Sequence, residues 1–306
     1  MQPRLYYCDN YHLPLPDGHK FPMEKYRLVR DLLASTGLFR FECAPFATRE
    51  QLARVHTAEY LDDFFGGTLS EQAVRRIGFP WSEGLIARTL ASVGGAVAAS
   101  LDAMECGFGG NLAGGTHHAF AHEGSGFCVF NDIAVAIENL RALGLASRVA
   151  VVDLDVHQGD GTAAIFAGDP DVLTFSMHGA NNFPFRKQSS RIDIALPNDT
   201  GDDEFLSHLQ RTLPAVLDFA PDVVFFQAGV DALLEDKLGR LAMTQSGLSA
   251  RNRIVFEAVR ERDIPLAVCM GGGYSLPIEH SVRAVAPRSA LTSAGVYLPR
   301  AAALTA

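Results

Sequence analysis

The sequence predicts an α/β fold in which a mostly parallel sheet is covered on both faces by helices. Short runs rich in β-branched residues alternate with longer helical patterns, which is typical of a parallel sheet with helical crossovers. The runs at 149–152 and 223–226 are apolar without alternation, as expected for strands buried on both faces. No linker rich in proline or serine and no internal repeat divides the chain, so we expect one catalytic domain over residues 1–306.

Each predicted strand is a short apolar run, and these runs occupy residues 5–7, 110–113, 149–154, 172–177, 223–227 and 266–270. Helical patterns lie between them, at residues 25–35, 48–64, 82–106, 127–143, 202–219 and 246–262. Within the helical pattern at 82–106, the small residues at 92–96 predict a helix packed closely inside the protein. Residues 286–306 are rich in Ala, Ser and Leu and fit either a closing helix or a loose tail.

Composition excludes several classes of protein. Hydrophobic residues make up 48% of the chain and charged residues 20%, which is the profile of a folded globular enzyme. The net charge of −9 argues against binding to nucleic-acid backbone, because phosphate contacts need a basic surface. The N-terminus has no apolar signal core, and the least polar stretch, 88–102, is shorter than the roughly 20 residues of a membrane span.

The five cysteines are scattered and form no CxxC pair. This pattern suggests neither a disulfide framework nor a zinc site built from thiolates. Reduced thiols are typical of a reducing compartment, so we expect the protein to be cytoplasmic. The sequence leaves the oligomeric state open.

Polar clusters follow four of the predicted strands. They comprise the segments 114–118, 153–157 and 271–274 and the single residue Asp231. In an open α/β sheet, ligands bind outside the carboxyl ends of the strands. We therefore expect the four clusters to converge at one site.

The segment 153–157 is the strongest candidate for metal binding. Side chains alternate along a strand, so Asp153, Asp155 and His157 are expected to point the same way. Carboxylates buried side by side need a compensating cation, and two carboxylates with an imidazole suit zinc with one open coordination position. Asp231 would supply the third ligand beside Asp155 and His157. Taken singly, either aspartate could instead cap a helix.

His117 and His118 lie in a glycine-rich turn that can present both rings. A neutral imidazole beside a metal site can accept a proton from water and return it to a leaving amine. Such rings need orienting partners, and Asp153 and Asp160 are available. By itself, a pair of histidines is also common in surface loops.

Tyr274 follows three glycines, at 271–273, in a loop that lacks the GxGxxG spacing of a dinucleotide site. A tyrosine after such a loop could donate its hydroxyl to an oxyanion that forms at the metal. A tyrosine packed into the loop is the alternative.

Together these segments resemble the histone deacetylase family, within the arginase/deacetylase superfamily. The matching stretches occur in the order of the family and cover most of residues 10–275; they are 16–22, 55–57, 114–118, 124–132, 153–161, 227–231 and 271–274. The resemblance implies the arginase/deacetylase fold and a zinc-dependent amidohydrolase that removes an acyl group from lysine in proteins or peptides.

Roles for the residues follow from the same resemblance. It implies zinc ligands Asp155, His157 and Asp231, and it makes His118 the general base and acid. His117 would assist electrostatically, Asp153 and Asp160 would orient the two histidines, and Tyr274 would stabilise the oxyanion. The substrate tunnel would be lined by Gly126, Phe127, Phe183 and Gly272. A structural potassium ion would be held by Asp153, Asp155, His157, Ser176 and Met177.

One departure from the commonest family pattern is informative. Gln158 follows His157, where class I and class II enzymes usually carry a second histidine. In this respect, and at 183–184 and 234–239, the chain is more similar to class IV members, which can prefer long fatty-acyl groups over acetyl. The sequence leaves the acyl length open.

Three other functions compete with lysine deacylation. An acylated polyamine or another small amide would use the same chemistry, and the negative net charge suits either cationic substrate. A binuclear manganese ureohydrolase would share the fold, but it has no evident use for His117, His118 and Tyr274. The third is an inactive acyl-lysine binder, against which stands the presence of every proposed catalytic residue.

Overall fold

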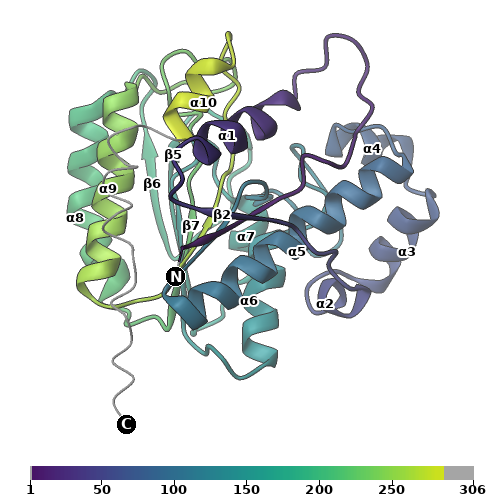
Figure 1. The fold of residues 1–306 in the computed structure, drawn as a ribbon, viewed down its shortest axis with the longest axis horizontal. Coiled ribbons are helices and arrows are strands. Elements are labelled where there is room, and N and C mark those ends of the chain that lie inside the picture. The colour runs from purple at the N-terminus through teal and green to yellow at the C-terminus, as the bar shows by residue number, and fades with distance from the viewer. Residues whose placement is uncertain (1, 286–306) are drawn as a thin grey trace.

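A computed structural model describes residues 2–285, which are built around one eight-stranded sheet (Figure 1). Its strand order is β2-β1-β3-β8-β7-β4-β5-β6, and every pairing is parallel. The strands in chain order are β1 Arg4–Tyr7, β2 Arg40–Cys43, β3 Phe108–Asn111, β4 Val149–Asp153, β5 Val172–Gly179, β6 Ile192–Leu196, β7 Val223–Gln227 and β8 Leu266–Cys269. The predicted α/β class with a parallel sheet is confirmed.

All six predicted strands occur, with ends that move by up to two residues, but β2 and β6 were not predicted. These two strands form the edges of the sheet. In β6, the half-buried Ile192 and Ile194 alternate with exposed residues, and β2 has no fully buried residue. The continuous apolar run that marks a strand buried on both faces is therefore missing from both edges.

Five long helices agree with the predicted patterns, although the helix expected at 127–143 begins five residues later. They are α1 Glu24–Ala34, α5 Glu83–Cys106, α6 Asp132–Ala142, α8 Asp202–Leu217 and α9 Gln245–Glu261. The pattern at 48–64 is two helices, α2 Arg49–Ala53 and α3 Ala58–Gly66, because Thr57 accepts a hydrogen bond from Tyr60 N and starts a new helix. Three short helices were not predicted, α4 Glu71–Ile77, α7 Asp160–Ile165 and α10 Glu279–Val285.

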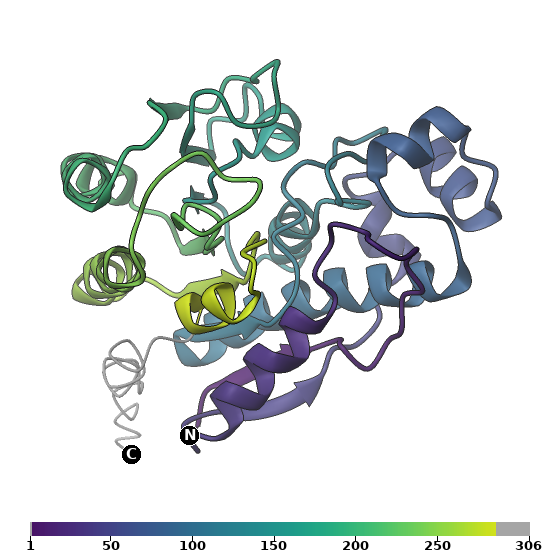
Figure 2. The same ribbon diagram turned by 90° about the horizontal axis from the view of Figure 1, so that it is seen from above.

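Helices cover both faces of the sheet, as predicted. Val149 and Val151 of β4 lie in the apolar cluster that includes α5 and α6, whereas Ala150 and Val152 lie in the cluster that includes α8 and α9. This alternation shows that β4 is buried on both sides. Seen from above, α1 lies beside α10 (Figure 2).

Helix α5 packs closely inside the protein, as its small residues predict. A Cβ atom on Gly94 would collide with the backbone oxygen of Pro45, and one on Gly95 would lie 2.6 Å from Asn111 Oδ1. Within residues 2–285, α5 is the one helix that is long and apolar enough to cross a membrane by length and composition. The apolar segment is thus longer than the predicted 88–102, but 61% of its most apolar window is buried against the rest of the protein.

The closing helix or tail expected at 286–306 lies outside the described residues.

Candidate metal centre and active site

The four polar clusters lie together beyond the carboxyl ends of β3, β4, β7 and β8. These strands are β3, β8, β7 and β4 in spatial order, so the site spans the middle of the sheet. One pocket is lined by residues of the segments 114–118, 153–157 and 271–274, including His117, His118, Asp155, His157 and Tyr274. Segments separated by more than 100 residues of sequence therefore form one site, as expected from the position of the strand ends.

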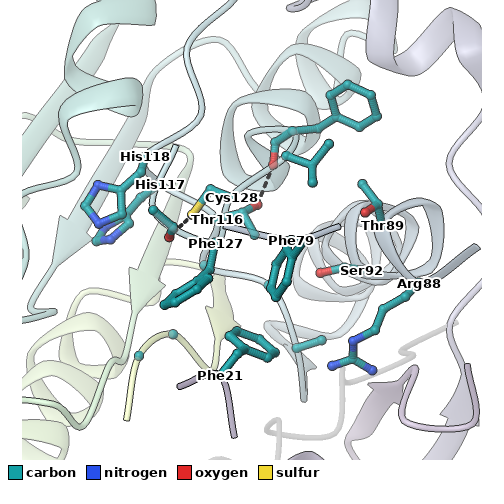
Figure 3. A pocket seen from close by; sticks show the side chains of 18 of the residues that line it. Phe21, Phe79, Arg88, Thr89, Ser92, Thr116, His117, His118, Phe127 and Cys128 are labelled. Carbon is teal, nitrogen blue, oxygen red and sulfur yellow. Dashed lines mark hydrogen bonds between the residues drawn. The ribbon is translucent and has the colours of Figure 1, made fainter. Parts of the chain in front are cut away.

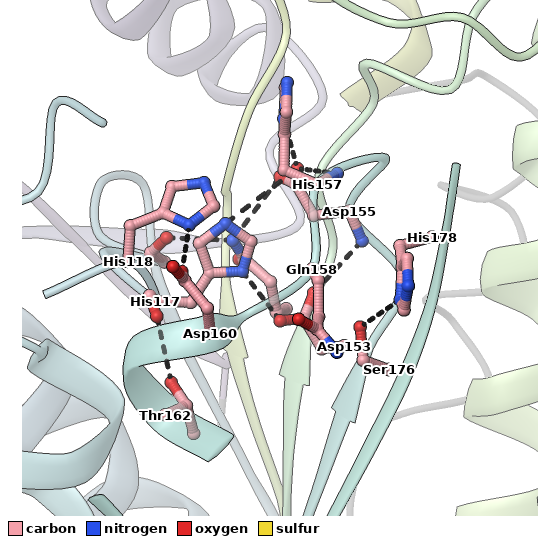
Figure 4. Close-up of polar contacts among 12 residues, drawn as sticks. His117, His118, Asp153, Asp155, His157, Gln158, Asp160, Thr162, Ser176 and His178 are labelled. Atoms are coloured by element: carbon pink, nitrogen blue, oxygen red, sulfur yellow. Dashed lines mark hydrogen bonds and ion pairs between the residues drawn. The ribbon is translucent and has the colours of Figure 1, made fainter. Parts of the chain in front are cut away.

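Asp155, His157 and Asp231 form a buried cluster whose ligand atoms all lie within 4.8 Å of one another. His157 Nδ1 is 3.0 Å from Asp155 Oδ1 and 3.1 Å from Asp231 Oδ2 (Figure 4). Two carboxylates and one imidazole suit zinc, with a coordination position left for water or substrate. A Cβ on Gly272 would lie 2.8 Å from Asp155 Oδ2, so the loop after β8 approaches the cluster as closely as only glycine allows.

Backbone hydrogen bonds, and not alternation along a strand, orient these ligands. The prediction that Asp153, Asp155 and His157 project from one strand face is wrong, because β4 ends at Asp153. Beyond it, Asp155 Oδ1 accepts from His157 N at 3.0 Å and Asp155 Oδ2 accepts from Gly272 N at 2.9 Å. Asp231 Oδ1 accepts from Val156 N at 2.9 Å. Asp155 and His157 therefore belong to the loop after β4, and there their side chains lie beside Asp231.

His117 and His118 each have a carboxylate partner (Figure 4). His117 Nδ1 is 2.7 Å from Asp153 Oδ2, and His118 Nδ1 is 2.6 Å from Asp160 Oδ1. The two rings are 4.2 Å apart, and the His118 ring is 5.8 Å from that of His157. In both histidines Nδ1 is engaged, which leaves Nε2 for a reacting group.

The two neighbouring histidines have opposite pKa shifts. Burial disfavours the charged ring of His117, but the carboxylates of Asp153 and Asp155 outweigh it and raise the pKa of His117 to about 9. Burial and the adjacent His117 lower the pKa of His118 to about 4. His118 is therefore the neutral member of the pair.

The glycine-rich turn that carries the histidines is fixed by Asp132, the first residue of α6. Its carboxylate accepts hydrogen bonds from Gly115 N at 2.9 Å and from Thr116 N at 2.7 Å. Gly114 and Gly115 have φ angles of 75° and 73°, which residues other than glycine rarely adopt. Sequence reasoning missed Asp132, although an aspartate at the start of a helical pattern is a signal for capping or turn contacts.

Tyr274 lies over the metal cluster, with its ring 6.5 Å from that of His157 and 6.2 Å from that of Phe127. Its backbone N–H donates to Asp236 Oδ2 at 2.6 Å. Burial, together with the negative charges of Asp231 and Asp155, holds the pKa of the Tyr274 hydroxyl well above its usual value. The hydroxyl is therefore a hydrogen-bond donor at neutral pH. Asp236 was not among the predicted site residues.

Gly126, Phe127 and Phe183 lie on the approach to the metal cluster. The Phe183 ring meets that of His118 edge-on at 4.9 Å. A Cβ on Gly126 would lie 2.8 Å from His118 Cδ2 and 3.0 Å from Phe183 Cε1. Glycine at this position therefore allows the backbone to pack directly against the two rings.

The pocket extends from the metal cluster and the two histidines to residues of α5 (Figure 3). We call the part near α5 the inner chamber, and sequence reasoning did not predict it. Its apolar walls are formed by Leu13, Phe21, Tyr26, Phe79 and Leu85. Arg88, Thr89 and Ser92 of α5 add polar groups at the far end. The buried Arg88 guanidinium donates to Cys8 O at 2.9 Å and lies 4.4 Å from the Tyr26 ring centroid.

Arg251 of α9 is fully buried beneath the metal loops. It donates to Leu154 O at 3.1 Å, just after β4, and to Gly229 O at 2.6 Å, just after β7. One guanidinium thus joins the loops that carry Asp155 and Asp231. An arginine in a helical pattern usually indicates a face exposed to solvent. The sequence therefore gives no sign that Arg251 is buried.

The predicted potassium ligands lie on two neighbouring strands and the loop after one of them. Ser176 of β5 is in register with Asp153 of β4, and its hydroxyl is 3.0 Å from His178 Nδ1 (Figure 4). The Met177 side chain is buried in the apolar cluster with α8 and α9. Potassium binding by Asp153, Asp155, His157, Ser176 and Met177 stays a prediction from the resemblance.

Comparisons with known proteins agree with this fold and site. The model of the histone deacetylase domain family matches residues 19–288. Histone deacetylase 2 of Arabidopsis thaliana is 32% identical over 88% of this chain and 72% of its own length. Histone deacetylase-like amidohydrolase of Pseudomonas aeruginosa is 34% identical over 86% of this chain and 74% of its own. An uncharacterized protein of Picosynechococcus sp. is 46% identical over 92% of this chain and 94% of its own.

Among solved structures, the crystal structure of the HDA15 HD domain has the same fold, with a TM-score of 0.77. The match covers 93% of this chain and 87% of the HDA15 chain, at 24% sequence identity. The parallel sheet and the polar residues at its carboxyl edge thus define an α/β protein with a candidate metal-dependent active site. The chain belongs to the histone deacetylase family.

Proposed function

We propose that this chain is a zinc-dependent hydrolase that removes an acyl group from the side-chain amine of lysine in a peptide or protein. The observation that carries the proposal is the position of His118 and Tyr274 near the Asp155–His157–Asp231 cluster, with ring centroids 5.8 and 6.5 Å from that of His157. A proton acceptor, a hydrogen-bond donor and a metal cluster around one point are the parts required for amide hydrolysis.

Asp155, His157 and Asp231 would hold the zinc ion. When bound, zinc acidifies water and polarises a carbonyl group. His118 accepts a proton from the attacking water at Nε2, because its Nδ1 is hydrogen-bonded to Asp160. It then delivers a proton to the leaving lysine amine. The cationic His117, paired with Asp153, and the Tyr274 hydroxyl stabilise negative charge that develops on the carbonyl oxygen.

The two ends of the pocket support separate parts of the substrate. A substrate passage beside Gly126, Phe127 and Phe183 would hold the aliphatic stem of lysine between aromatic rings. The inner chamber belongs to the same pocket as the metal cluster, and the acyl group would enter it. Its walls of leucine, phenylalanine and tyrosine support acyl groups longer than acetyl, which agrees with the predicted class IV likeness.

Replacing Tyr274 by phenylalanine tests the chemistry. Tyr274→Phe removes the hydroxyl donor and keeps the ring, so we expect kcat to fall about 10²-fold or more while zinc content is unchanged. The measurement is turnover of acyl-lysine peptides, with zinc determined in the same preparation. Tyr11→Phe is the matched control, because Tyr11 lies by Cys43 at the edge of the sheet. Unchanged turnover in Tyr274→Phe would rule out this role.

A series of lysine peptides carrying acetyl to myristoyl groups, read by mass spectrometry, tests the substrate. We expect the hydrophobic chamber to favour a chain longer than acetyl. Acylated polyamines are added as competitors in the same assay. If they are hydrolysed in preference to the peptides, the proposed substrate is a polyamine and not a lysine side chain. Two manganese ions per chain in metal analysis would instead indicate a ureohydrolase site.

We also propose a cytoplasmic location. The five cysteines are free, and three of them, Cys8, Cys128 and Cys269, are buried. Free thiols in this number are typical of a reducing compartment.

A further inference from the structure

Gln158, the residue that departs from the commonest family pattern, makes hydrogen bonds with both atoms of its side-chain amide. It is 1% exposed and follows the candidate ligand His157. Its Oε1 accepts from Gln188 N at 2.9 Å, and its Nε2 donates to Gln188 O at 2.8 Å. Nε2 also donates to Asp193 Oδ1 at 2.9 Å. The side chain therefore pairs with the backbone of Gln188 as a neighbouring strand would.

The segment that Gln158 contacts connects β5 to β6 and carries Phe183. Its other end is fixed by Asn182, whose Nδ2 donates to Leu238 O at 2.8 Å and whose Oδ1 accepts from Arg240 N at 3.2 Å. Phe183 lies between these two attachments. The segment is also held internally, since Lys187 Nζ donates to Asn182 O and to Pro184 O, both at 2.6 Å. Phe185, Arg186 and Gln188 are exposed, so the buried Gln158 is what ties this part of the segment to the metal loop.

The position of this segment determines where the Phe183 ring lies relative to His118. The Phe183 ring is 4.9 Å from that of His118 and borders the space above Gly126. We propose that Gln158 is a positioning residue that sets the width of the substrate passage by fastening the Phe183 segment to the metal loop. The proposal rests on the proposed function in one respect, that acyl-lysine passes beside Phe183.

The chemistry of an amide explains why glutamine serves here. A primary amide presents a donor and an acceptor side by side, which matches the N–H and C=O of Gln188. An imidazole carries its donor and acceptor on different sides of a ring, and a carboxylate has no donor. Neither histidine nor glutamate can reproduce the full set of contacts.

The first test is kinetic. Gln158→Met keeps the length of the side chain and removes all three hydrogen bonds. We expect KM for the acyl-lysine peptide to rise about fivefold or more, as losing buried hydrogen bonds predicts, with kcat within about twofold and zinc content unchanged. Gln188→Ala is the matched control, because it leaves the backbone partners of Gln158 in place. A fall in kcat at constant KM would overturn the proposal.

A double-mutant cycle separates positioning from general destabilisation. If Gln158 acts through Phe183, the effects of Gln158→Met and Phe183→Ala on KM should not add when the two are combined. Fully additive effects would contradict the proposal. Gln158→Glu provides a second variant: it keeps the acceptor for Gln188 N but sets a carboxylate against Gln188 O and Asp193 Oδ1, so its effect on KM should be at least as large as that of Gln158→Met.

Hydrogen exchange tests the same idea without any substrate. In Gln158→Met, backbone amides of residues 183–190 should exchange faster, while those of β7 should not change. Unchanged exchange in 183–190 would overturn the positioning role even if the enzyme is active. If the wild-type protein hydrolyses no acyl-lysine peptide but exchange rises as expected, the proposed function fails and the attachment by Gln158 stands.

Discussion

The adjacent residues His117 and His118 show how far the surroundings decide the chemistry of one residue type. His117 faces the carboxylates of Asp153 and Asp155, and its pKa is raised to about 9. His118 is buried beside a cationic neighbour, and its pKa is lowered to about 4. One ring is suited to carry charge and the other to accept a proton. The sequence shows two identical side chains, and only the resemblance separates their roles.

His56 allows a test of stability against pH outside the metal cluster. Its Nδ1 is 3.1 Å from Phe120 O and its Nε2 accepts from Asn131 N at 3.0 Å, so the ring is held neutral. Burial lowers its pKa from 6.5 to about 4. The unfolded chain therefore binds the proton first, and the stability that the neutral ring contributes is full above pH 6.5 and is lost as pH falls toward 4.

We expect this loss to be about 2 kcal/mol of unfolding free energy between pH 7 and pH 5. Denaturant unfolding at the two pH values measures it. His56→Gln should remove this part of the dependence, whereas the exposed His12→Gln should keep it. An equal loss in wild type and His56→Gln would show that His56 does not titrate in this way.

The residues of the site divide by whether their type suggests a role. Asp155, His157, Asp231 and the two histidines are polar groups next to apolar strands, and such groups stand out in a sequence. Arg251 and Gln158 act through backbone atoms of distant segments. No local pattern encodes those partners, so the structure was needed to find them.

Among the elements, α5 packs closely on its neighbours, as at Gly94 and the backbone of Pro45. We expect Gly94→Ala to lower the unfolding free energy by about 1–3 kcal/mol, because the added methyl group has to displace backbone. Thermal or denaturant unfolding measures the change. Gly66→Ala in α3 is the control, since its Cβ would be 3.7 Å from the nearest atom. A Gly94→Ala variant as stable as Gly66→Ala would contradict this packing.

The elements that the sequence did not reveal share a physical cause. The strands β2 and β6 are sheet edges, and α4, α7 and α10 are helices of six or seven residues. Short helices and half-buried strands depend on tertiary contacts more than on their own pattern. In contrast, β4 and β7 are buried over all five residues and were predicted closely.

For the whole molecule, metal binding should couple to stability. Asp155 and Asp231 come from loops after different strands, so a bound zinc ion joins two parts of the fold. Zinc at 100 times its Kd should stabilise the protein by about 2.7 kcal/mol, and a chelator should lower Tm. Asp231→Asn should abolish most of the zinc-dependent shift. Equal Tm values with zinc and with chelator in wild type would contradict zinc binding at this cluster.

The strand order has a consequence for how the chain folds. β8, the last strand of the sheet, lies between β3 and β7. Until it is in place, β2-β1-β3 and β7-β4-β5-β6 are two separate half-sheets with no pairing between them. The sheet therefore closes only after residues 266–269 have been synthesised, and the strand that closes it brings Tyr274 to the metal cluster. We therefore expect completion of the sheet and assembly of the active site to be one late, long-range step, and such steps slow folding.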